Sequence, residues 1–378
     1  MALKRTARQA RRAFILGMAA GFVALASCQT GPRLPVETGP PEPPPTGLAY
    51  NGIAVIVPLT GTDGPIGTSI SNAAKLALLD TAEKSLRITV YDSAAAGGAA
   101  AAAEKAIADG NRLILGPLLA EDVRAAAPIA RRASVPVIAF SNDEAVAGNG
   151  VFIMGFTPDQ SISRVVSHAR GRGVKSFGAL VPTGLYGQRA AQSLLSAVQR
   201  SGGQVAAIET YDRSQASLTA AARRLNAKTM DAVLIGDSSR MAALAAPVLK
   251  VGPRRLGTEL WGTDRTINKN SGLRGAWFAA APDTQFDKLV TRYRARYGKT
   301  PYRLASLGYD SVLLAVRSAR NWPIGRQFPA RTIVDNDGFA GVDGNFRFRR
   351  DGIAERLLEV REVNQAGAAV VSPAATAF

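Results

Sequence analysis

The sequence is poor in the side chains on which metal centres and many catalytic sites depend. It contains one cysteine, Cys28, and one histidine, His168, so no disulfide can form within the chain. His168 stands near Arg164 and Arg170 on an expected helix, which indicates a solvated helix face, and no nucleophile-elbow motif is present. No His, Cys and Asp residues have the spacing of metal ligands. We therefore predict that the protein is not an enzyme and holds no metal or cofactor.

Acidic residues are absent from the first 28 residues, which have the layout of a secretion signal. Bases precede an apolar run at 13–26 that is too short, and too rich in Ala and Gly, for a transmembrane helix. Leu25-Ala26-Ser27-Cys28 resembles the bacterial lipobox, in which the signal is cleaved before a cysteine that receives a diacylglyceryl group. We predict a signal peptide at 1–27, a membrane lipid on Cys28 and a periplasmic location. Gln29 after the cysteine, in place of Asp, favours the outer membrane.

Large apolar residues are scarce in the segment that follows the cysteine. Residues 29–47 are built mainly from Pro, Gly, Thr and Glu, with a cluster of prolines at 40–45. This composition cannot form a core, and prolines hold a chain extended at about 3.1 Å per residue. We predict a tether at 28–49 and a globular domain that begins near Tyr50.

Acidic residues are fewer than basic ones over the whole chain. It contains 29 Asp and Glu against 46 Lys and Arg, which gives a formal net charge of +17. Such a surplus favours anionic neighbours and says nothing about the fold. The run at 292–299 mixes bases with aromatics, as some nucleic-acid binders do. An exported protein meets no nucleic acid, so we interpret this run as a basic helix end that suits the helix dipole. Contact with an anionic partner, such as the cell-wall polymer or an acidic face of a protein, is the alternative.

From Gly52 onward, short aliphatic runs alternate with Ala-rich helical stretches, which is typical of parallel sheets covered by helices. A first winding ends near Phe156, and a second one follows. We expect strands at 52–57, 86–91, 113–115, 135–140, 177–181, 204–209, 232–235 and 259–262, with helices between them.

The C-terminal quarter is too small to form a domain of its own. Amphipathic helices are expected at 285–297 and 305–319, and strands at 345–348 and 357–363. We place the helices on the first lobe and the strands on the second. The domains are then lobe 1 at 50–156 and 280–331, lobe 2 at 157–279 and 332–366, and a flexible tail at 367–378. Several crossings between lobes make a hinge.

Glycines at 61, 64 and 67, with Asp92 at the end of the second strand, imitate a dinucleotide-binding fingerprint. The spacing is GxxGxxG, and Pro58 and Pro65 remove backbone donors that a phosphate needs. We interpret the segment as a turn at the rim of a cleft.

Several short segments, in this order, resemble the leucine/isoleucine/valine-binding family of periplasmic binding proteins. They are Val57-Pro58-Leu59-Thr60-Gly61, Tyr91-Asp92, Leu115-Gly116-Pro117-Leu118, Tyr186-Gly187 and Tyr297-Gly298-Lys299. The resemblance implies an α/β type I periplasmic-binding fold, in which two lobes, each a mostly parallel sheet flanked by helices, close around a ligand by a multi-crossover hinge.

Three segments are similar to the penicillin-binding protein activator branch of that superfamily: Gly116-Pro117-Leu118-Leu119, Val181-Pro182 and Leu234-Ile235-Gly236-Asp237-Ser238. This resemblance implies a non-catalytic lipoprotein whose partner is a peptidoglycan synthase or the cell-wall polymer. The alternative is a receptor that passes amino acids or a related small ligand to an ABC transporter.

Amino-acid binders of the family hold the substrate carboxylate with a hydroxyl and backbone N–H groups after the third strand. Here Ala120 stands where the family has Ser, and Asp143 where a Thr helps to grip the α-amino group, while Asp264 could meet an ammonium and Tyr186 could pack over a ligand. Amino-acid binding is therefore less expected than the fold suggests. The candidate cleft residues are Leu59, Thr60, Leu119, Ala120, Ser141, Asn142, Asp143, Tyr186, Asp237, Ser238 and Asp264.

Overall fold

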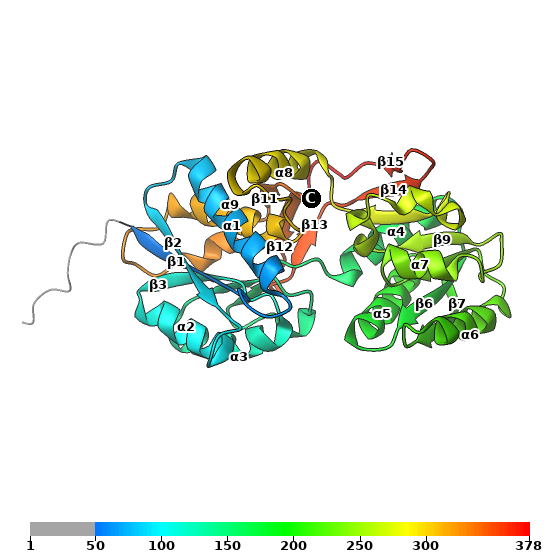
Figure 1. Ribbon diagram of the computed structural model, residues 1–378, viewed down its shortest axis with the longest axis horizontal. Coiled ribbons are helices and arrows are strands. Elements are labelled where there is room, and N and C mark those ends of the chain that lie inside the picture. Colours follow the sequence, from blue (N-terminus) through cyan, green and yellow to red (C-terminus); the bar gives the residue numbers. More distant parts are fainter. Residues whose placement is uncertain (1–49) are drawn as a thin grey trace, which may run out of the picture. The chain divides into compact units, whose positions relative to one another are not determined.

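The computed structural model describes residues 50–378, which Figure 1 shows as a ribbon. The expected signal peptide, the lipid site at Cys28 and the tether lie outside these residues. Among the helices of residues 50–378, none is both long and apolar enough to cross a bilayer. Residues 50–378 lie in one compact unit with hydrophobic cores of its own, as expected of a domain that folds independently.

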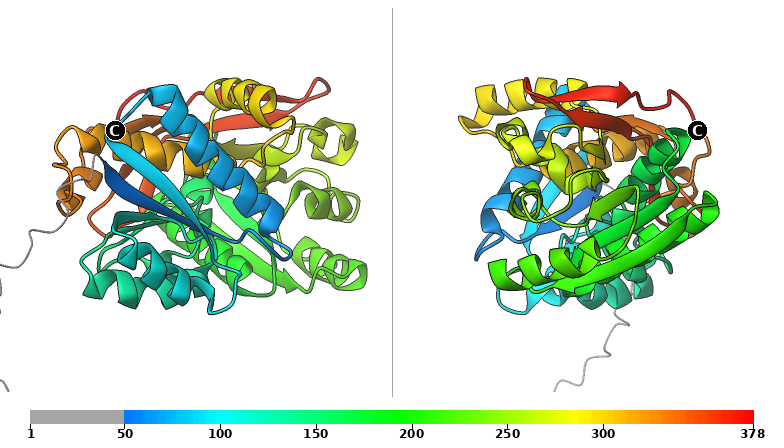
Figure 2. Two further views of the ribbon diagram at one scale, coloured as in Figure 1. Left: turned by 60° about the vertical axis from the view of Figure 1, so that its left-hand side comes forward. Right: turned by 90° about the vertical axis from the view of Figure 1, so that its right-hand side faces the viewer.

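The first lobe is built on a five-stranded parallel sheet with strand order β2-β1-β3-β4-β5. Ile53, Val55 and Val57 of β1 face the core that α1 covers, whereas Ala54 and Ile56 face the core under α2 and α3. Burial on both faces explains why β1 is apolar without alternation. Figure 2 shows α1 on the opposite side of this sheet from α2 and α3. The elements are β1 (Asn51–Val57), α1 (Gly64–Thr81), β2 (Leu86–Asp92), α2 (Gly98–Ala108), β3 (Asn111–Leu115), α3 (Ala120–Arg132), β4 (Val137–Ala139), η1 (Glu144–Val146) and β5 (Val151–Ile153).

The second lobe repeats this winding on a seven-stranded sheet with order β15-β14-β10-β9-β8-β6-β7. Five of its strands run parallel, while β14 and β15 are antiparallel to their neighbours. The elements are α4 (Pro158–Gly171), β6 (Ser176–Pro182), α5 (Leu185–Arg200), β7 (Gln204–Tyr211), α6 (Gln215–Asn226), β8 (Ala232–Ile235), α7 (Ser239–Ala245), β9 (Arg254–Gly257), η2 (Glu259–Thr263), η3 (Ile267–Lys269), η4 (Ser271–Leu273), β10 (Trp277–Ala280), β14 (Glu359–Val363) and β15 (Ala368–Ser372).

After β10 the chain returns to the first lobe. Helix α8 (Thr284–Tyr297) packs there through Phe286 and Leu289, and α9 (Ala305–Ala319) packs along α1. The turn η5 (Ala330–Ile333) leads to a small antiparallel sheet of β11 (Phe339–Gly341), β12 (Gly344–Phe348) and β13 (Ala354–Arg356). The chain passes between the lobes at residues 154–157, 281–283 and 357–358, which form the hinge segments.

Three expectations about the later elements are wrong. The strand at 345–348 belongs to the first lobe, because Phe346 and Phe348 enter its core. The segment 259–262 is the 3-10 turn η2, and the sheet position is taken by the preceding strand β9. The tail is not free at 368–372, because β15 pairs with β14 and Arg164 donates a hydrogen bond to Ser372. In each case tertiary pairing decides what a short local pattern leaves open.

Candidate functional site

A cavity of about 390 Å³ lies where the loops of the two lobes meet. Its walls come mainly from loops that follow the carboxyl ends of strands, which is where ligands bind in open α/β sheets. The volume suits a small organic molecule. The lining residues are Asp63, Ile66, Leu118, Leu119, Phe140, Asn142, Phe156, Glu259, Leu260, Gly262, Thr263, Ala280, Ala281, Arg303 and Leu304.

The wall from lobe 1 is largely apolar. Ile66 of α1, Leu118 and Leu119 after β3, and the rings of Phe140 and Phe156 all line it. The loop of Leu118 lies against β1 because Gly116 has no side chain: a Cβ there would stand 2.1 Å from the Ile56 carbonyl oxygen. This wall offers a ligand apolar surface and few hydrogen-bond partners.

The wall from lobe 2 supplies a carboxylate, that of Glu259. Tyr186 donates a hydrogen bond to Glu259 Oε1 at 3.0 Å, and Ser161 donates to the other oxygen. Burial raises the pKa of Glu259, and within residues 50–378 its carboxylate enters no ion pair. A partly buried carboxylate whose side-chain partners are hydroxyl groups gains from a nearby cation, because the cation offsets its lost hydration.

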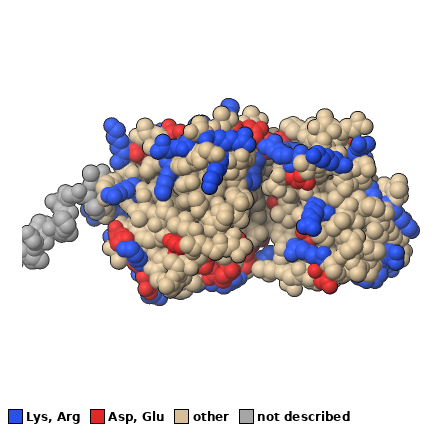
Figure 3. Space-filling model, viewed as in Figure 1, with Lys and Arg blue, Asp and Glu red and all other residues tan. Residues whose placement is uncertain are grey.

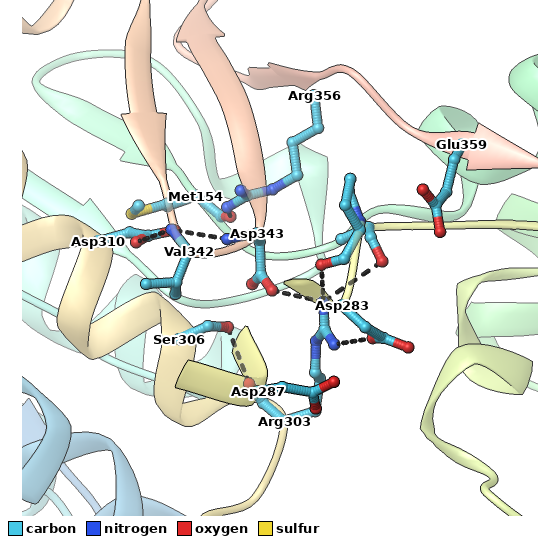
Figure 4. Close-up of polar contacts among 12 residues, drawn as sticks. Met154, Asp283, Asp287, Arg303, Ser306, Asp310, Val342, Asp343, Arg356 and Glu359 are labelled. Atoms are coloured by element: carbon cyan, nitrogen blue, oxygen red, sulfur yellow. Dashed lines mark hydrogen bonds and ion pairs between the residues drawn. The ribbon is translucent and has the colours of Figure 1, made fainter. Parts of the chain in front are cut away.

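Arg303 is the cation among the lining residues, but two aspartates of the protein already neutralise its charge. Its guanidinium contacts Asp283 and Asp343, each at 2.6 Å, and also donates to the Ala281 and Pro282 carbonyl oxygens (Figure 4). Its side chain is 15% exposed, so these partners enclose most of it. Arg303 therefore joins the hinge segment to lobe 1 and offers a ligand anion little free charge.

The loop after β3 lacks a grip for a carboxylate. Helix α3 begins at Ala120. Its N-cap residue is Leu119, whose side chain cannot accept a hydrogen bond from the first N–H groups of the helix. Glu121 and Asp122 occupy the first turn of the helix. These acids oppose binding of an anion to the positive end of the helix dipole. Besides the missing hydroxyl at Ala120, the negative charges of Glu121 and Asp122 thus disfavour a ligand carboxylate at this loop.

Asp143 is engaged by the protein itself. Its carboxylate, 2% exposed, contacts Arg124 of α3 at 2.5 Å and also Arg189 of α5 in the other lobe. The Asp143 N–H donates to Ser141 Oγ, which orders the same turn. Asp143 and Ser141 do not line the cavity. The expected ligand grip is instead an ionic contact between the lobes.

The remaining candidates lie around the cleft with partners of their own. Leu59 N and Thr60 Oγ donate to Asp92, which ties the turn after β1 to β2. Asp237 accepts from Tyr211 and Arg213, Ser238 caps α7, and Asp264 accepts from Ser239 and Thr266. Of the candidates only Leu119 and Asn142 line the cavity, while Tyr186 reaches it through Glu259.

The glycines after β1 have a packing role. A Cβ on Gly67 would lie 1.8 Å from the Pro58 carbonyl oxygen. Lobe 2 repeats this contact, since a Cβ on Gly187 would lie 1.7 Å from the Pro182 carbonyl oxygen. Close approach of helix to strand explains both glycines, and a phosphate ligand is not needed to explain them.

Sequence reasoning missed most of the cavity lining, above all Ile66, Phe140, Phe156, Glu259 and Arg303. Glu259 has the clearest signal, an acid two residues beyond the carboxyl end of a strand. The sequence pattern hides this signal, because it predicts the strand at 259–262 and not at the preceding β9.

The family profile described as periplasmic binding protein matches residues 52–368. The chain belongs to the periplasmic binding protein family. This membership implies a periplasmic location, and the cleft between the lobes is where such a protein would hold its ligand.

Solved structures share the fold at low sequence identity. A putative branched-chain amino acid ABC transporter protein from Rhodospirillum rubrum aligns with a TM-score of 0.73 and 20% identity, covering 85% of this chain and 100% of that one. The substrate-binding protein LivJ from Streptococcus pneumoniae, in complex with isoleucine, aligns with a TM-score of 0.64 and 18% identity, covering 86% and 100%.

One curated relative, an uncharacterized protein of Rickettsia prowazekii, is 26% identical over 174 residues. The alignment covers 46% of this chain and 47% of the relative, so the chain spans about half the length of that protein.

Proposed function

We propose that the cleft binds a small, largely apolar ligand that carries an ammonium group and no free carboxylate, and that the protein does not transform it. The observation that carries the proposal is Glu259, a partly buried carboxylate in the cavity wall without a cationic partner in the described chain. An ammonium placed beside it would be held by a charge-assisted hydrogen bond. The apolar wall from lobe 1 would bury the body of the ligand.

The same residues argue against a zwitterionic amino acid. Isoleucine is the ligand named for the Streptococcus pneumoniae structure, and such a molecule brings a carboxylate as well as an ammonium. In this cleft the carboxylate would find Arg303 neutralised by two aspartates, and the start of α3 behind Leu119 carries Glu121 and Asp122. Burying an unpaired carboxylate costs several kcal/mol, about enough to cancel the gain at Glu259.

Leucine and its two halves test the proposal by isothermal calorimetry on residues 47–378. The probes are leucine, 3-methylbutylamine, which lacks the carboxylate, and 4-methylpentanoate, which lacks the amine. We expect the amine to bind about 10-fold or more tightly than either of the others, because only the amine leaves no charge unpaired. Micromolar binding of leucine, isoleucine or valine, with weaker binding of the amine, would reverse the proposal.

We further propose that Cys28 is acylated and holds the domain on the outer membrane, where it regulates a peptidoglycan synthase. The support is the lipobox-like Leu25–Cys28 and the activator-like segment Gly116–Leu119. In a reconstituted glycan synthesis assay, the acylated protein should raise the rate of its partner synthase. Failure of a pull-down to detect any synthase counts against this role.

Delivery of the ligand to an ABC transporter is the second candidate. The names of the similar structures favour it, since several describe transporter substrate-binding proteins. Ligand-dependent stimulation of a reconstituted permease and its ATPase, with no effect on glycan synthesis, would select transport over regulation.

A further inference from the structure

Helix α8 exposes a row of bases outside the cleft, and among residues 50–378 only Arg292 of this row contacts an acid. Lys288, Arg292 and Arg296 follow one another at intervals of four residues, so they share one side of the helix. Lys299 follows the row just after the helix ends, Arg294 lies on another side of the helix, and Asp287 is the one acid among five bases between Thr284 and Lys299. Figure 3 shows Lys and Arg gathered along the edge of the molecule where Figure 1 places α8.

Packing fixes which side of α8 faces outward. Phe286, Leu289 and Tyr293 are buried in the first core, and Tyr297 Oη donates to the Asn72 carbonyl oxygen of α1. All five bases are exposed. The row is therefore a property of the folded helix rather than of a loose segment.

Most of these charges are free within the described chain. Arg292 contacts Asp80 of α1 at 3.0 Å, and Asp287 is taken by Arg265 of lobe 2. Lys288, Arg294, Arg296 and Lys299 enter no ion pair among residues 50–378. The surface keeps a positive field that needs an external anion to neutralise it.

Exposed apolar side chains border the row. Leu79, 55% exposed, precedes the Asp80 that Arg292 contacts, and Lys75 lies exposed one turn earlier on α1. Tyr302, 50% exposed, is fixed near the start of α1 because its N–H donates to Ser69. Bases with interspersed leucine and tyrosine suit the boundary between lipid head groups and acyl chains.

We infer that this α8 face, defined by Lys75, Leu79, Lys288, Arg292, Arg296, Lys299 and Tyr302, docks on a bilayer surface that contains anionic lipids. The bases recur about every 6 Å along the helix, on long side chains and without a pocket, which fits a smeared surface charge better than one discrete anion. Cys28 stands 22 residues before Tyr50, and an extended linker of that length reaches about 70 Å. A lipid on Cys28 would thus keep the face within reach of a membrane, although the inference does not depend on that anchor.

Vesicle co-sedimentation of residues 47–378 tests the inference without any contribution from the N-terminal segment. The vesicles contain phosphatidylcholine alone or with about one third phosphatidylglycerol. We expect binding to the anionic vesicles only, weakened about 10-fold or more between 50 and 300 mM salt, because screening shortens the reach of exposed charges.

Two triple variants with the same change in net charge provide the matched comparison. Lys288→Glu, Arg296→Glu and Lys299→Glu reverse the α8 face and should weaken vesicle binding about 10-fold or more. Arg223→Glu, Lys228→Glu and Lys250→Glu change exposed bases of lobe 2 and should weaken it less than 3-fold. Circular dichroism and the melting temperature verify that both variants fold.

Three outcomes would overturn the inference. Equal losses in the two triple variants would show that net charge alone drives binding. Equal binding to both vesicle compositions would remove the role of anionic lipid. Tighter binding to soluble peptidoglycan fragments than to vesicles, lost on reversal of α8, would assign the face to the cell-wall polymer instead.

Discussion

The two lobes share a winding but line the cleft with different chemistry. Each places a glycine against a proline carbonyl where its first strand turns into a helix, Gly67 on Pro58 and Gly187 on Pro182. Lobe 1 then presents an apolar wall, whereas lobe 2 presents Glu259 with its hydroxyl partners. The shared turn follows from close packing of helix on strand, and the difference lies in loops that packing leaves free to vary.

The lobes also meet through two aspartates in unlike settings. Asp283, in a hinge segment, contacts Arg303 at 2.6 Å and Arg361 of β14 at 2.7 Å. Asp143, at the cleft rim, contacts Arg124 and Arg189. Asp283 belongs to an enclosed network, while one arginine of Asp143 is half exposed, so we expect the hinge contact to matter more for stability.

Arg303→Met should have the largest effect of the changes considered. It leaves Asp283 with fewer partners and Asp343 buried without its cation, so the free energy of unfolding should fall by about 3–5 kcal/mol. Denaturant unfolding followed by fluorescence measures this change. Arg331→Met, at an exposed arginine, is the control and should stay within about 0.5 kcal/mol. Equal effects of the two variants would refute the hinge network.

Glu259→Gln tests the difference between the two walls. It removes the charge and nearly keeps the shape, so affinity for 3-methylbutylamine should fall about 10- to 100-fold while the melting temperature changes little. Asp63→Asn alters the other acid of the lining and should lower the affinity less than about 3-fold.

Calorimetry at several pH values adds a check on the role of Glu259. Because burial raises the pKa of Glu259, amine affinity should decrease as the pH falls and the carboxylate becomes protonated.

Asp310 of α9 gives lobe 1 a pH dependence of its own. Its carboxylate accepts hydrogen bonds from Val342 N at 2.7 Å and Asp343 N at 3.4 Å, which holds the turn between β11 and β12 (Figure 4). Burial, and then the charge of Asp343, raises the pKa of Asp310 to about 7. The folded state therefore binds this proton more tightly than the unfolded chain does.

The consequence is a loss of stability as the pH rises from about 4 through about 7, since the contribution of Asp310 is complete only below its unfolded pKa. Thermal unfolding of Asp310→Asn should lack this part of the pH dependence, and Asp337→Asn, at an exposed acid, should retain it. A wild-type slope in Asp310→Asn would show that another group titrates.

Arg189→Met should have the smallest effect, because Arg124 still neutralises Asp143. We expect a loss of about 1 kcal/mol or less in stability and a more open average arrangement of the lobes in solution. Small-angle scattering of the unliganded domain measures the radius of gyration. No change in the scattering curve would mean that the rim contact does not hold the lobes together.

The sequence carried much of the fold and little of the site. The apolar run of β1 and the alternation of strands with Ala-rich helices follow from local patterns. The placement of α8 and α9 on lobe 1 rests instead on the C-terminal quarter being too small to form a domain of its own. Phe346 and Phe348 show a period of two, but nothing local says which core receives them. The sequence predicts that Asp143 is available to a ligand, because nothing local shows that Arg189 of the other lobe pairs with it. The surroundings of Glu259 also depend on tertiary contacts, because its hydrogen-bond donors Ser161 and Tyr186 come from distant segments.

The small molecule that the domain carries offers the most direct test of the cleft. The protein, produced with its own N-terminal segment, exported and purified without prior unfolding, would be analysed by native mass spectrometry, and the released molecule identified. A compound with a protonatable nitrogen, an apolar body and no carboxylate is the predicted result. A branched-chain amino acid or another carboxylic acid as the released molecule would contradict the account.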